Sequence, residues 1–206
     1  GQTLQLCPAD KLLYALRDVT ATVESIPLIA SSIMSKKLAA GAGVIMLDVK
    51  TGGGAFMADP QDARSLAEAM VRIGSLSGRK TAALITDMSQ PLGNAVGNAL
   101  EVIEAIEILQ GRGGGDLLAV ATALAGRMLR LAELACGADE ADALLRDALS
   151  SGRALRKLAE IVEAQGGDAR VTEDATRMPR AALVSAVAAP RSGVVSGFDC
   201  RGLGLA

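Results

Sequence analysis

The chain has 206 residues, half of them apolar, and 21 basic against 23 acidic side chains give it a formal net charge of −2. This apolar content excludes a disordered chain, while the slight acidity and the scarcity of aromatic residues (Tyr14, Phe56 and Phe198) argue against a nucleic-acid binder. Because the sequence has no histidine, a local Ser-His-Asp or Cys-His catalytic set and a His-ligated metal are excluded as well.

Two short helices are predicted at the start of the chain. The first covers residues 9–17, with Pro8 in its first turn, and the second begins after the N-cap residue Ser25 and ends near Ala40. We expect residues 1–40 to form one helical segment.

Polar side chains on these two helices can form one small site. Tyr14 and Arg17 are three residues apart and Ser32 and Lys36 four apart, so each pair shares a helix face. The loop between the helices can bring both faces together, with no nearby carboxylate to neutralise the two cations. Such a site suits a planar ligand with several carbonyl oxygens that gains negative charge during a reaction.

Spacing alone favours a purely structural role for both cations. Arg17 would then pair with Asp18 or Glu24, and Lys36 and Lys37 would form a solvated helix end near the favourable C-terminal dipole. Most surface charges are solvated in this way.

An α/β pattern follows the helical segment. Apolar runs over residues 44–49 and 81–86 predict two buried strands, and Asp59 opens a helix between them. A further helix over residues 95–110 completes an order that is typical of a parallel sheet with helical crossovers. Residues 116–165 continue in a helical pattern.

The composition changes again near the end of the chain. Residues 181–189 and 194–198 are rich in β-branched side chains and turn signals, which predicts strands. We therefore expect an α/β fold with a mostly parallel sheet and flanking helices over residues 41–180. An incomplete, strand-rich α+β unit would follow over residues 181–206.

A glycine-rich loop follows the first predicted strand. Residues 50–57 run Lys-Thr-Gly-Gly-Gly-Ala-Phe-Met, and the three glycines let the backbone approach a ligand and expose N–H groups. Ligands of open α/β sheets bind outside the carboxyl ends of strands, although a tight strand–helix turn explains the glycines equally well. Phe56 can wall a flat base, or it can be a core side chain.

A second loop, over residues 87–93, leads into a helix that contains Glu101 and Glu104. Backbone carbonyls near a helix start, with a carboxylate from the following turns, can bind a hard cation. Because such glutamates are more often solvated, the spacing alone is only a weak indication of a metal site.

The cellular location of the protein is predicted from its cysteines and from its apolar stretches. Cys7, Cys136 and Cys200 form no Cys-x-x-Cys pair, so neither a disulfide framework nor a zinc site is expected. The longest apolar stretch, residues 117–126, is too short to span a bilayer, and residues 1–8 do not have the order of a signal peptide. We expect a cytoplasmic protein that binds neither membranes nor nucleic acid.

Three strings in the sequence resemble a known family. Residues 14–37 begin Tyr-Ala-Leu-Arg-Asp-Val-Thr-Ala-Thr, residues 47–57 run Leu-Asp-Val-Lys-Thr-Gly-Gly-Gly-Ala-Phe-Met, and residues 85–101 begin Ile-Thr-Asp-Met-Ser-Gln-Pro-Leu-Gly-Asn. On these strings the chain resembles the pyrimidine-nucleoside and thymidine phosphorylases. The resemblance implies phosphorolysis: phosphate attacks C1′ of thymidine, deoxyuridine or uridine and releases the base and a (2-deoxy)ribose 1-phosphate. Anthranilate phosphoribosyltransferase and AMP phosphorylase share the architecture, but these strings favour pyrimidines.

The same resemblance assigns roles to individual residues. It implies that the pyrimidine is bound by Tyr14, Arg17, Ile29, Ser32, Lys36 and Phe56. Arg17 and Lys36 would be catalytic, because the departing base gains charge on its carbonyl groups and two cations can stabilise that charge more in the transition state. No organic cofactor is implied, and inorganic phosphate is the co-substrate.

A potassium ion is implied by one branch of the family, the pyrimidine-nucleoside phosphorylases. The matching positions are Leu92 and Ala95, through their backbone carbonyls, and the carboxylate of Glu104. The resemblance also implies a homodimer.

Some family features have no match in this chain. The phosphate-binding Lys-x-Ser-Thr-Gly-Gly string, a Ser-Gly-Arg-Gly signature and a histidine near the glycosidic bond would all precede residue 1, and the family chain would continue beyond Ala206. We expect an internal part of a phosphorylase that carries the base-binding half of the site and is inactive by itself. The alternative is a chain that only binds pyrimidine or assembles with a partner.

Overall fold

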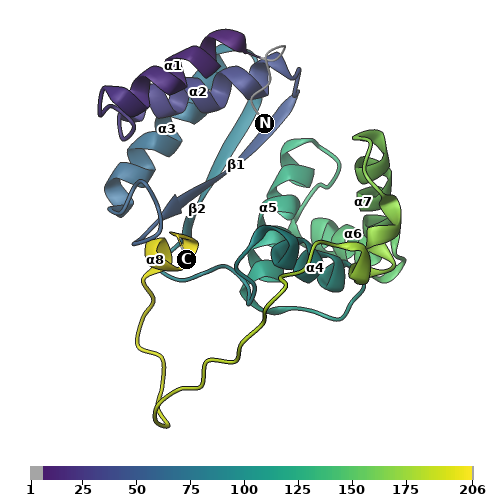
Figure 1. Cartoon of the computed structure of the whole chain (residues 1–206). Coiled ribbons are helices and arrows are strands. Elements are labelled where there is room, and N and C mark those ends of the chain that lie inside the picture. Colours follow the sequence, from purple (N-terminus) through teal and green to yellow (C-terminus); the bar gives the residue numbers. More distant parts are fainter. Residues whose placement is uncertain (1–6, 206) are drawn as a thin grey trace. The chain divides into compact units, whose positions relative to one another are not determined.

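Residues 7–205 are described by a computed structural model, shown in Figure 1. The elements are α1 (Pro8–Val19), α2 (Ile26–Ala39), β1 (Val44–Thr51), α3 (Pro60–Leu76), β2 (Lys80–Asp87), α4 (Asn98–Leu109), α5 (Gly115–Leu131), α6 (Ala138–Ser150), α7 (Arg153–Ala164), the 3-10 helices η1 (Ala169–Thr172) and η2 (Ala175–Arg177), and α8 (Cys200–Leu205). They form two compact units, the first with residues up to Ser89 and Ala123–Ala141, the second with Gln90–Thr122 and the residues after Ala141. None of the described helices has both the length and the hydropathy that a membrane crossing requires.

A parallel pair of strands forms the sheet of the first unit (Figure 1). β1 and β2 pair in register along their whole length, from Val44 opposite Lys80 to Thr51 opposite Asp87, and α3 makes the crossover between them. Parallel strands need such a crossover because they run in the same direction. The structure is therefore a mostly helical α/β fold with a small, two-stranded parallel sheet, and the predicted strand–helix–strand order is confirmed.

The hydrophobic core of this unit is built from β1 and from helices α2 and α3. Ile45, Leu47 and Val49 of β1 are buried, because side chains alternate between the faces of a strand. Met34 of α2 and Met70 of α3 are almost wholly buried in this core. Its members are Ile29, Ala30, Met34, Ile45, Leu47, Val49, Met57, Ala63, Leu66, Ala67 and Met70.

Both strands are less buried than their apolar sequences predict. In β1 the alternation leaves Asp48 exposed between buried Leu47 and Val49, and β2 has no buried residue. The expectation of two fully buried strands is wrong, because in the described part of the chain the packed core takes up one face of β1 and β2 pairs only with β1.

Helix α3 comes very close to β2 at Gly74. A Cβ at this position would lie 2.7 Å from the Cβ of Thr81 and 2.0 Å from its Oγ1. A glycine inside a helix costs about 1 kcal/mol relative to alanine. The close approach of α3 to β2 explains why the helix has a glycine at position 74 in spite of this cost.

The second unit is helical in its described part. Ile106 and Ile108 of α4 are buried, and the Nε2 of Gln110, just after α4, donates to the carbonyl of Thr172 at 2.8 Å. Since Thr172 is itself buried, this bond ties the end of α4 to η1.

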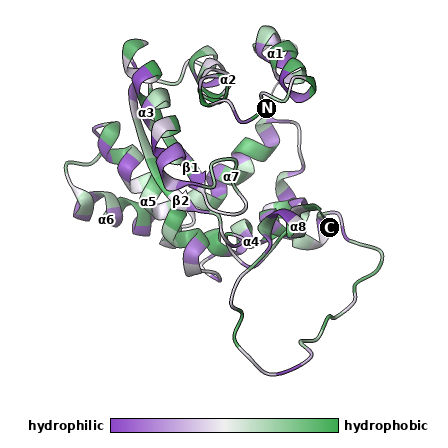
Figure 2. Ribbon diagram, turned by 90° about the vertical axis from the view of Figure 1, so that its left-hand side faces the viewer, coloured by the Kyte–Doolittle hydropathy of each residue, from purple (hydrophilic) through white to green (hydrophobic). Residues whose placement is uncertain are grey.

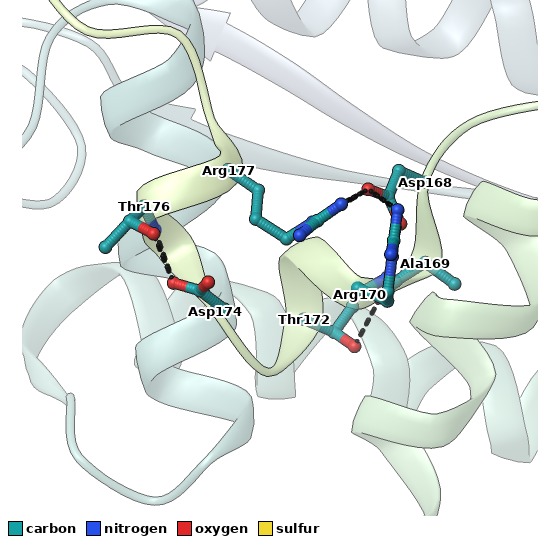
Figure 3. Close-up of polar contacts among 7 residues, drawn as sticks. All are labelled: Asp168, Ala169, Arg170, Thr172, Asp174, Thr176 and Arg177. Carbon is teal, nitrogen blue, oxygen red and sulfur yellow. Dashed lines mark hydrogen bonds and ion pairs between the residues drawn. The ribbon is translucent and has the colours of Figure 1, made fainter.

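Two arginines converge on Asp168, which precedes η1 (Figure 3). Arg170 donates through Nε at 2.8 Å and Nη2 at 3.0 Å, and Arg177 of η2 donates through Nε at 2.8 Å. The hydrogen bonds from Arg170 first, and from Arg177 second, hold the pKa of Asp168 far below its usual range. The carboxylate therefore stays ionised and links η1 to η2.

The segment before α8 contains no strand. Residues 181–199 form an open loop with green, apolar stretches in Figure 2, and Val187 and Val194 are 95% and 96% exposed. A strand is stable only when its backbone groups pair with a neighbouring strand, and no described residue provides one here. The strands expected over residues 181–189 and 194–198 are thus wrong, whereas the division of the chain into residues 1–40, 41–180 and 181–206 stays a prediction.

Replacing Gly74 by alanine is expected to destabilise the fold. The new methyl group would overlap Thr81, and such overpacking typically costs about 1–3 kcal/mol, which exceeds the gain in helix propensity. The free energy of unfolding from urea titrations measures the effect. Gly43→Ala is the matched control, because nothing lies within 4 Å of a Cβ at that exposed position. Equal stability of the two variants would contradict the packing argument.

Candidate functional site

An apolar pocket of about 300 Å³ opens in the first unit, beside the carboxyl end of β1. Ile29 and Ile33 of α2 form one wall, and Phe56 of the glycine loop, 66% exposed, forms another. The remaining lining comes from Asp48, Val49, Lys50, Gly54, Ala55, Met57, Leu66, Met70 and Met88. The volume is at the lower end for small-molecule sites, which suits a small, flat ligand.

Phe56 is not a core residue. Its exposed ring in a chain with so few aromatic residues leaves a flat apolar surface available to a ligand. The core interpretation of Phe56 is therefore wrong, while its role as a wall for a base stays a prediction.

A polar network lies on the face of β1 that is opposite the packed core. The Nζ of Lys50 lies 2.7 Å from Oδ2 of Asp48 and donates to Oγ1 of Thr86 at 2.9 Å, and the Thr86 hydroxyl donates to Asp48. The strand register accounts for this contact, because Lys50 lies directly opposite Thr86 and Asp48 is two residues away on the same face. All three polar groups contact one another, so Lys50 is held in an ion pair and is not a free cation.

The glycine loop is locked to the loop that follows β2. Gly52 has φ +108°, and a Cβ there would lie 2.4 Å from Oγ of Ser89, so no other residue fits. Met88 donates its N–H to Thr51 O at 2.6 Å and accepts from Gly54 N–H at 2.9 Å. The turn interpretation accounts for these bonds, and the Gly54 N–H, which we expected to be exposed for a ligand, is already used.

Asp87 holds the second loop from its own side. Its Oδ1 accepts from the backbone N–H of Ser89 at 3.0 Å. Hydrogen bonds from the side chain and backbone of Ser89 lower the pKa of the Asp87 carboxyl. The close packing of the two loops that follow β1 and β2 therefore depends on Gly52 in the first loop and on the carboxylate of Asp87 in the second.

Helix α1 buries charge instead of apolar side chains. Its two buried residues are Asp10 and Arg17, while Leu12, Leu13 and Leu16 are more than half exposed. This is the reverse of an ordinary surface helix, which buries its apolar stripe.

Arg17 is held by backbone carbonyls and by Tyr14. Its Nε donates to Thr22 O at 3.4 Å and its Nη2 donates to Val23 O. The guanidinium carbon also lies 5.3 Å from the centre of the Tyr14 ring, a cation–π distance. The structure therefore brings Tyr14 and Arg17 together as their spacing predicts. The alternative pairing of Arg17 with Asp18 or Glu24 is wrong, because its guanidinium donates to backbone carbonyl groups instead.

Lys36 is paired with a carboxylate that the sequence prediction did not include. Its Nζ donates to Oδ2 of Asp10 at 2.6 Å and to Oγ of Ser32 at 2.9 Å. Ser32 and Asp10 are each 8% exposed, and the side chain of Lys36 is 25% exposed. Two expectations are thus corrected: the site does contain a nearby carboxylate, and Lys36 is not a solvated helix end.

The predicted base-binding residues form three neighbouring groups. Ile29 and Phe56 line the apolar pocket, Ser32 contacts Lys36, and Tyr14 contacts Arg17. The polar side chains are not part of the pocket wall. They are related to it through α2, where Ile29, Ser32, Ile33 and Lys36 follow the i, i+3, i+4, i+7 pattern of one helix stripe.

The predicted potassium ligands lie in the second unit, around a tight turn before α4. Both oxygens of Glu104 accept backbone N–H groups, from Asn94 at 2.8 Å and Ala95 at 3.0 Å. Gly93, with φ +79°, allows this turn because a Cβ there would lie 2.6 Å from Oε2 of Glu104. Within residues 7–205 no three acidic or cysteine side chains gather to hold a metal, so any cation here would depend on backbone carbonyls.

Sequence reasoning missed Asp10 and the Asp48–Thr86 contact. A signal was available for the first, because Asp10, Tyr14 and Arg17 follow the i, i+4, i+7 spacing of one helix face. The second depends on the register of β1 against β2, which the sequence does not fix.

Comparison with known proteins places this arrangement in a family. The model of the glycosyl transferase family, a/b domain, matches residues 1–155. Over all 206 residues the chain is 54% identical to the pyrimidine-nucleoside phosphorylases of Bacillus subtilis (strain 168) and of Geobacillus stearothermophilus. It is 52% identical to that of Staphylococcus epidermidis (strain ATCC 12228 / FDA PCI 1200).

The chain spans about half the length of these curated relatives, 48% of each. The family match covers both the strand pair and the helices that carry the candidate site. The chain therefore belongs to the glycosyl transferase family with this a/b domain, and it is a homologue of pyrimidine-nucleoside phosphorylases.

Proposed function

We propose that this chain supplies the base-binding half of a pyrimidine-nucleoside phosphorylase. Phosphate would attack C1′ of thymidine, deoxyuridine or uridine, the C1′–N bond would break, and the free base and (2-deoxy)ribose 1-phosphate would leave. The observation that carries the proposal is the pair of helices α1 and α2, which bury Arg17 and hold Lys36 beside an apolar pocket. The homology to pyrimidine-nucleoside phosphorylases supports the choice of substrate class.

The pocket would bind the ring, and the cations would act on its charge. Ile29 and the exposed ring of Phe56 present flat apolar surfaces that a pyrimidine would cover. As the glycosidic bond breaks, negative charge grows on the ring carbonyl groups. Arg17 and Lys36 would stabilise that charge, and Ser32 and Tyr14 would hydrogen-bond or pack at the polar edge.

The fold fixes both of the proposed catalytic cations, Arg17 and Lys36. Arg17 is 6% exposed and held by the carbonyl groups of Thr22 and Val23, and Lys36 is held by Ser32 and Asp10. Donors fixed before the reaction do not have to reorganise as charge develops, which is the condition under which electrostatic catalysis is strong. The fixed positions of both cations, and the burial of Arg17, therefore support a catalytic role.

The remaining features of the proposal rest on the family. We propose a homodimer, for which the exposed Leu12, Leu13 and Leu16 of α1 offer an apolar face of the kind that interfaces bury. A cytoplasmic location agrees with three cysteines that are all unpaired. Inorganic phosphate would be the co-substrate, bound by residues other than those of this chain.

A potassium ion would be held by the carbonyl groups of Leu92 and Ala95 and by Glu104. The donor set is all oxygen, which suits a hard cation, and the Glu104 carboxylate already reaches the turn that contains Ala95. When bound, the ion would order this turn. It would take no part in bond breaking.

Phosphorolysis assays test the proposal directly. The full-length protein is expected to convert thymidine and uridine to free base in the presence of phosphate. The change in absorbance that accompanies release of the base measures this conversion. The 206-residue chain by itself is expected to show no turnover. A full-length protein that binds pyrimidine without turnover would instead support the alternative, a binding or assembly function, and turnover by the short chain would contradict the division into halves.

Lys36→Ala is expected to lower kcat/KM by about 100- to 1,000-fold, the loss typical for one donor that stabilises a developing anion. Steady-state kinetics of the full-length enzyme with thymidine measure this. Lys37→Ala is the matched control, because it removes an equal charge from the same last turn of α2. Similar kinetics for both variants would remove Lys36 from the catalytic set.

Removal of potassium is expected to lower both activity and thermal stability of the full-length enzyme, because the turn before α4 would lose its cation. The comparison is between buffers with potassium and buffers in which a bulky organic cation replaces it. Glu104→Gln should abolish the potassium response, and Glu107→Gln, an exposed change on the same helix, should leave it unaltered. A wild-type enzyme indifferent to potassium would exclude the site.

A further inference from the structure

We propose that Asp10 is a positioning residue of the pyrimidine site, which fixes the ammonium group of Lys36 where negative charge develops on the base. This inference rests on the function proposed above and adds a residue to it. It is carried by the contact of Asp10 with Lys36, together with the unusual burial of α1.

The ammonium group of Lys36 is oriented by two acceptors. Oδ2 of Asp10 lies 2.6 Å from Nζ and Oγ of Ser32 lies 2.9 Å from it. An ammonium has three N–H donors, and among residues 7–205 these are the two side chains that accept from Lys36. The group therefore keeps donor capacity for a ligand, and its direction is set by Asp10 from one helix and Ser32 from the other.

Stability alone does not explain this pair. An apolar residue at position 10 would let α1 pack without burying a carboxylate, and buried ion pairs are often no more stabilising than apolar replacements. Yet α1 buries Asp10 and Arg17 and leaves Leu12, Leu13 and Leu16 exposed. The outward leucines suit the homodimer interface proposed above, but the inward charges of Asp10 and Arg17 still break the ordinary pattern, and such breaks are expected at functional sites.

The inward face of α1 is continuous with the catalytic cations. Asp10, Tyr14 and Arg17 lie on one stripe of α1, and Asp10 reaches across to Lys36 of α2. Helix α1 thus supplies the guanidinium group of Arg17 itself and fixes the position of the Lys36 ammonium group through the carboxylate of Asp10. Since Lys36 has a long, flexible stem, its head group would otherwise sample several positions.

Loss of the carboxylate should act on the chemical step more than on substrate binding. Charge on the base is small in the ground state and large in the transition state, so a misplaced ammonium mainly removes transition-state stabilisation. A displacement of about 1 Å at a reacting group can cost about 100-fold in rate. We therefore expect Asp10→Asn to lower kcat by about 10- to 100-fold with a change in KM of less than about threefold.

The experiment compares three variants of the full-length enzyme with wild type. Asp10→Asn removes the charge at nearly constant shape, and Asp10→Glu keeps the charge on a longer stem. Asp62→Asn is the matched control, because Asp62 is likewise an acidic residue in the first turn of its helix but is exposed. The readouts are kcat and KM for thymidine and the midpoint of thermal unfolding for every variant.

A large fall in kcat for Asp10→Asn, partial recovery in Asp10→Glu and wild-type kinetics in Asp62→Asn would support the inference. Equal kcat in Asp10→Asn and wild type, or a loss expressed mainly in KM, would overturn it. If Asp10→Asn unfolds, Asp10→Glu decides: a folded Glu variant with unchanged kcat and a lower thermal midpoint assigns Asp10 a structural role only. If the wild-type enzyme catalyses no phosphorolysis, the proposed function is overturned and this inference with it. If the wild type is active and the Asp10 variants have the same kinetics, only the assignment of Asp10 is overturned.

Discussion

The parallel register of β1 against β2 is the constraint on which the first unit depends. It brings Thr51 and Asp87 to the same edge of the sheet, so the two loops that follow the strands must lie against each other. They do so through paired backbone hydrogen bonds and through Gly52, whose missing Cβ makes room for Ser89. The apolar pocket opens at this edge, in agreement with the general position of ligand sites in open α/β sheets.

Polar groups near that pocket are fixed in pairs rather than left free. Lys50 is paired with Asp48, two residues away on the same strand, and Lys36 is paired with Asp10 of the neighbouring helix. The two lysines have partners of the same kind, because each also donates to one hydroxyl group, Lys50 to Thr86 and Lys36 to Ser32. The proposed assignment of Lys36, and not Lys50, to the departing base therefore rests on the family and on the place of Lys36 on α2.

The sequence predicts the local structure well and the tertiary contacts only in part. The helix over residues 9–17, the start of α2 after Ser25 and the strand–helix–strand order are confirmed, although the Ser25 side chain makes no capping hydrogen bond. Burial of the strands and the strands expected after residue 180 are wrong, because both depend on partners that a local pattern does not reveal. Likewise, helical spacing pairs Tyr14 with Arg17 and Ser32 with Lys36 and places Asp10 on the same face of α1, but the contact of Asp10 with Lys36 depends on the packing of α1 on α2.

The pocket and the cations divide the proposed work between binding and catalysis. If the proposed function holds, a pyrimidine would cover the apolar surface of Phe56 and Ile29 equally in the ground state and in the transition state, so their contribution would be seen in KM. Arg17 and Lys36 would interact more strongly as charge grows, so their contribution would be seen in kcat. Under this proposal the cations need not lie in the pocket wall, because they would meet only the carbonyl edge of the ring, and the stripe on α2 that joins Ile29 to Lys36 would set that separation.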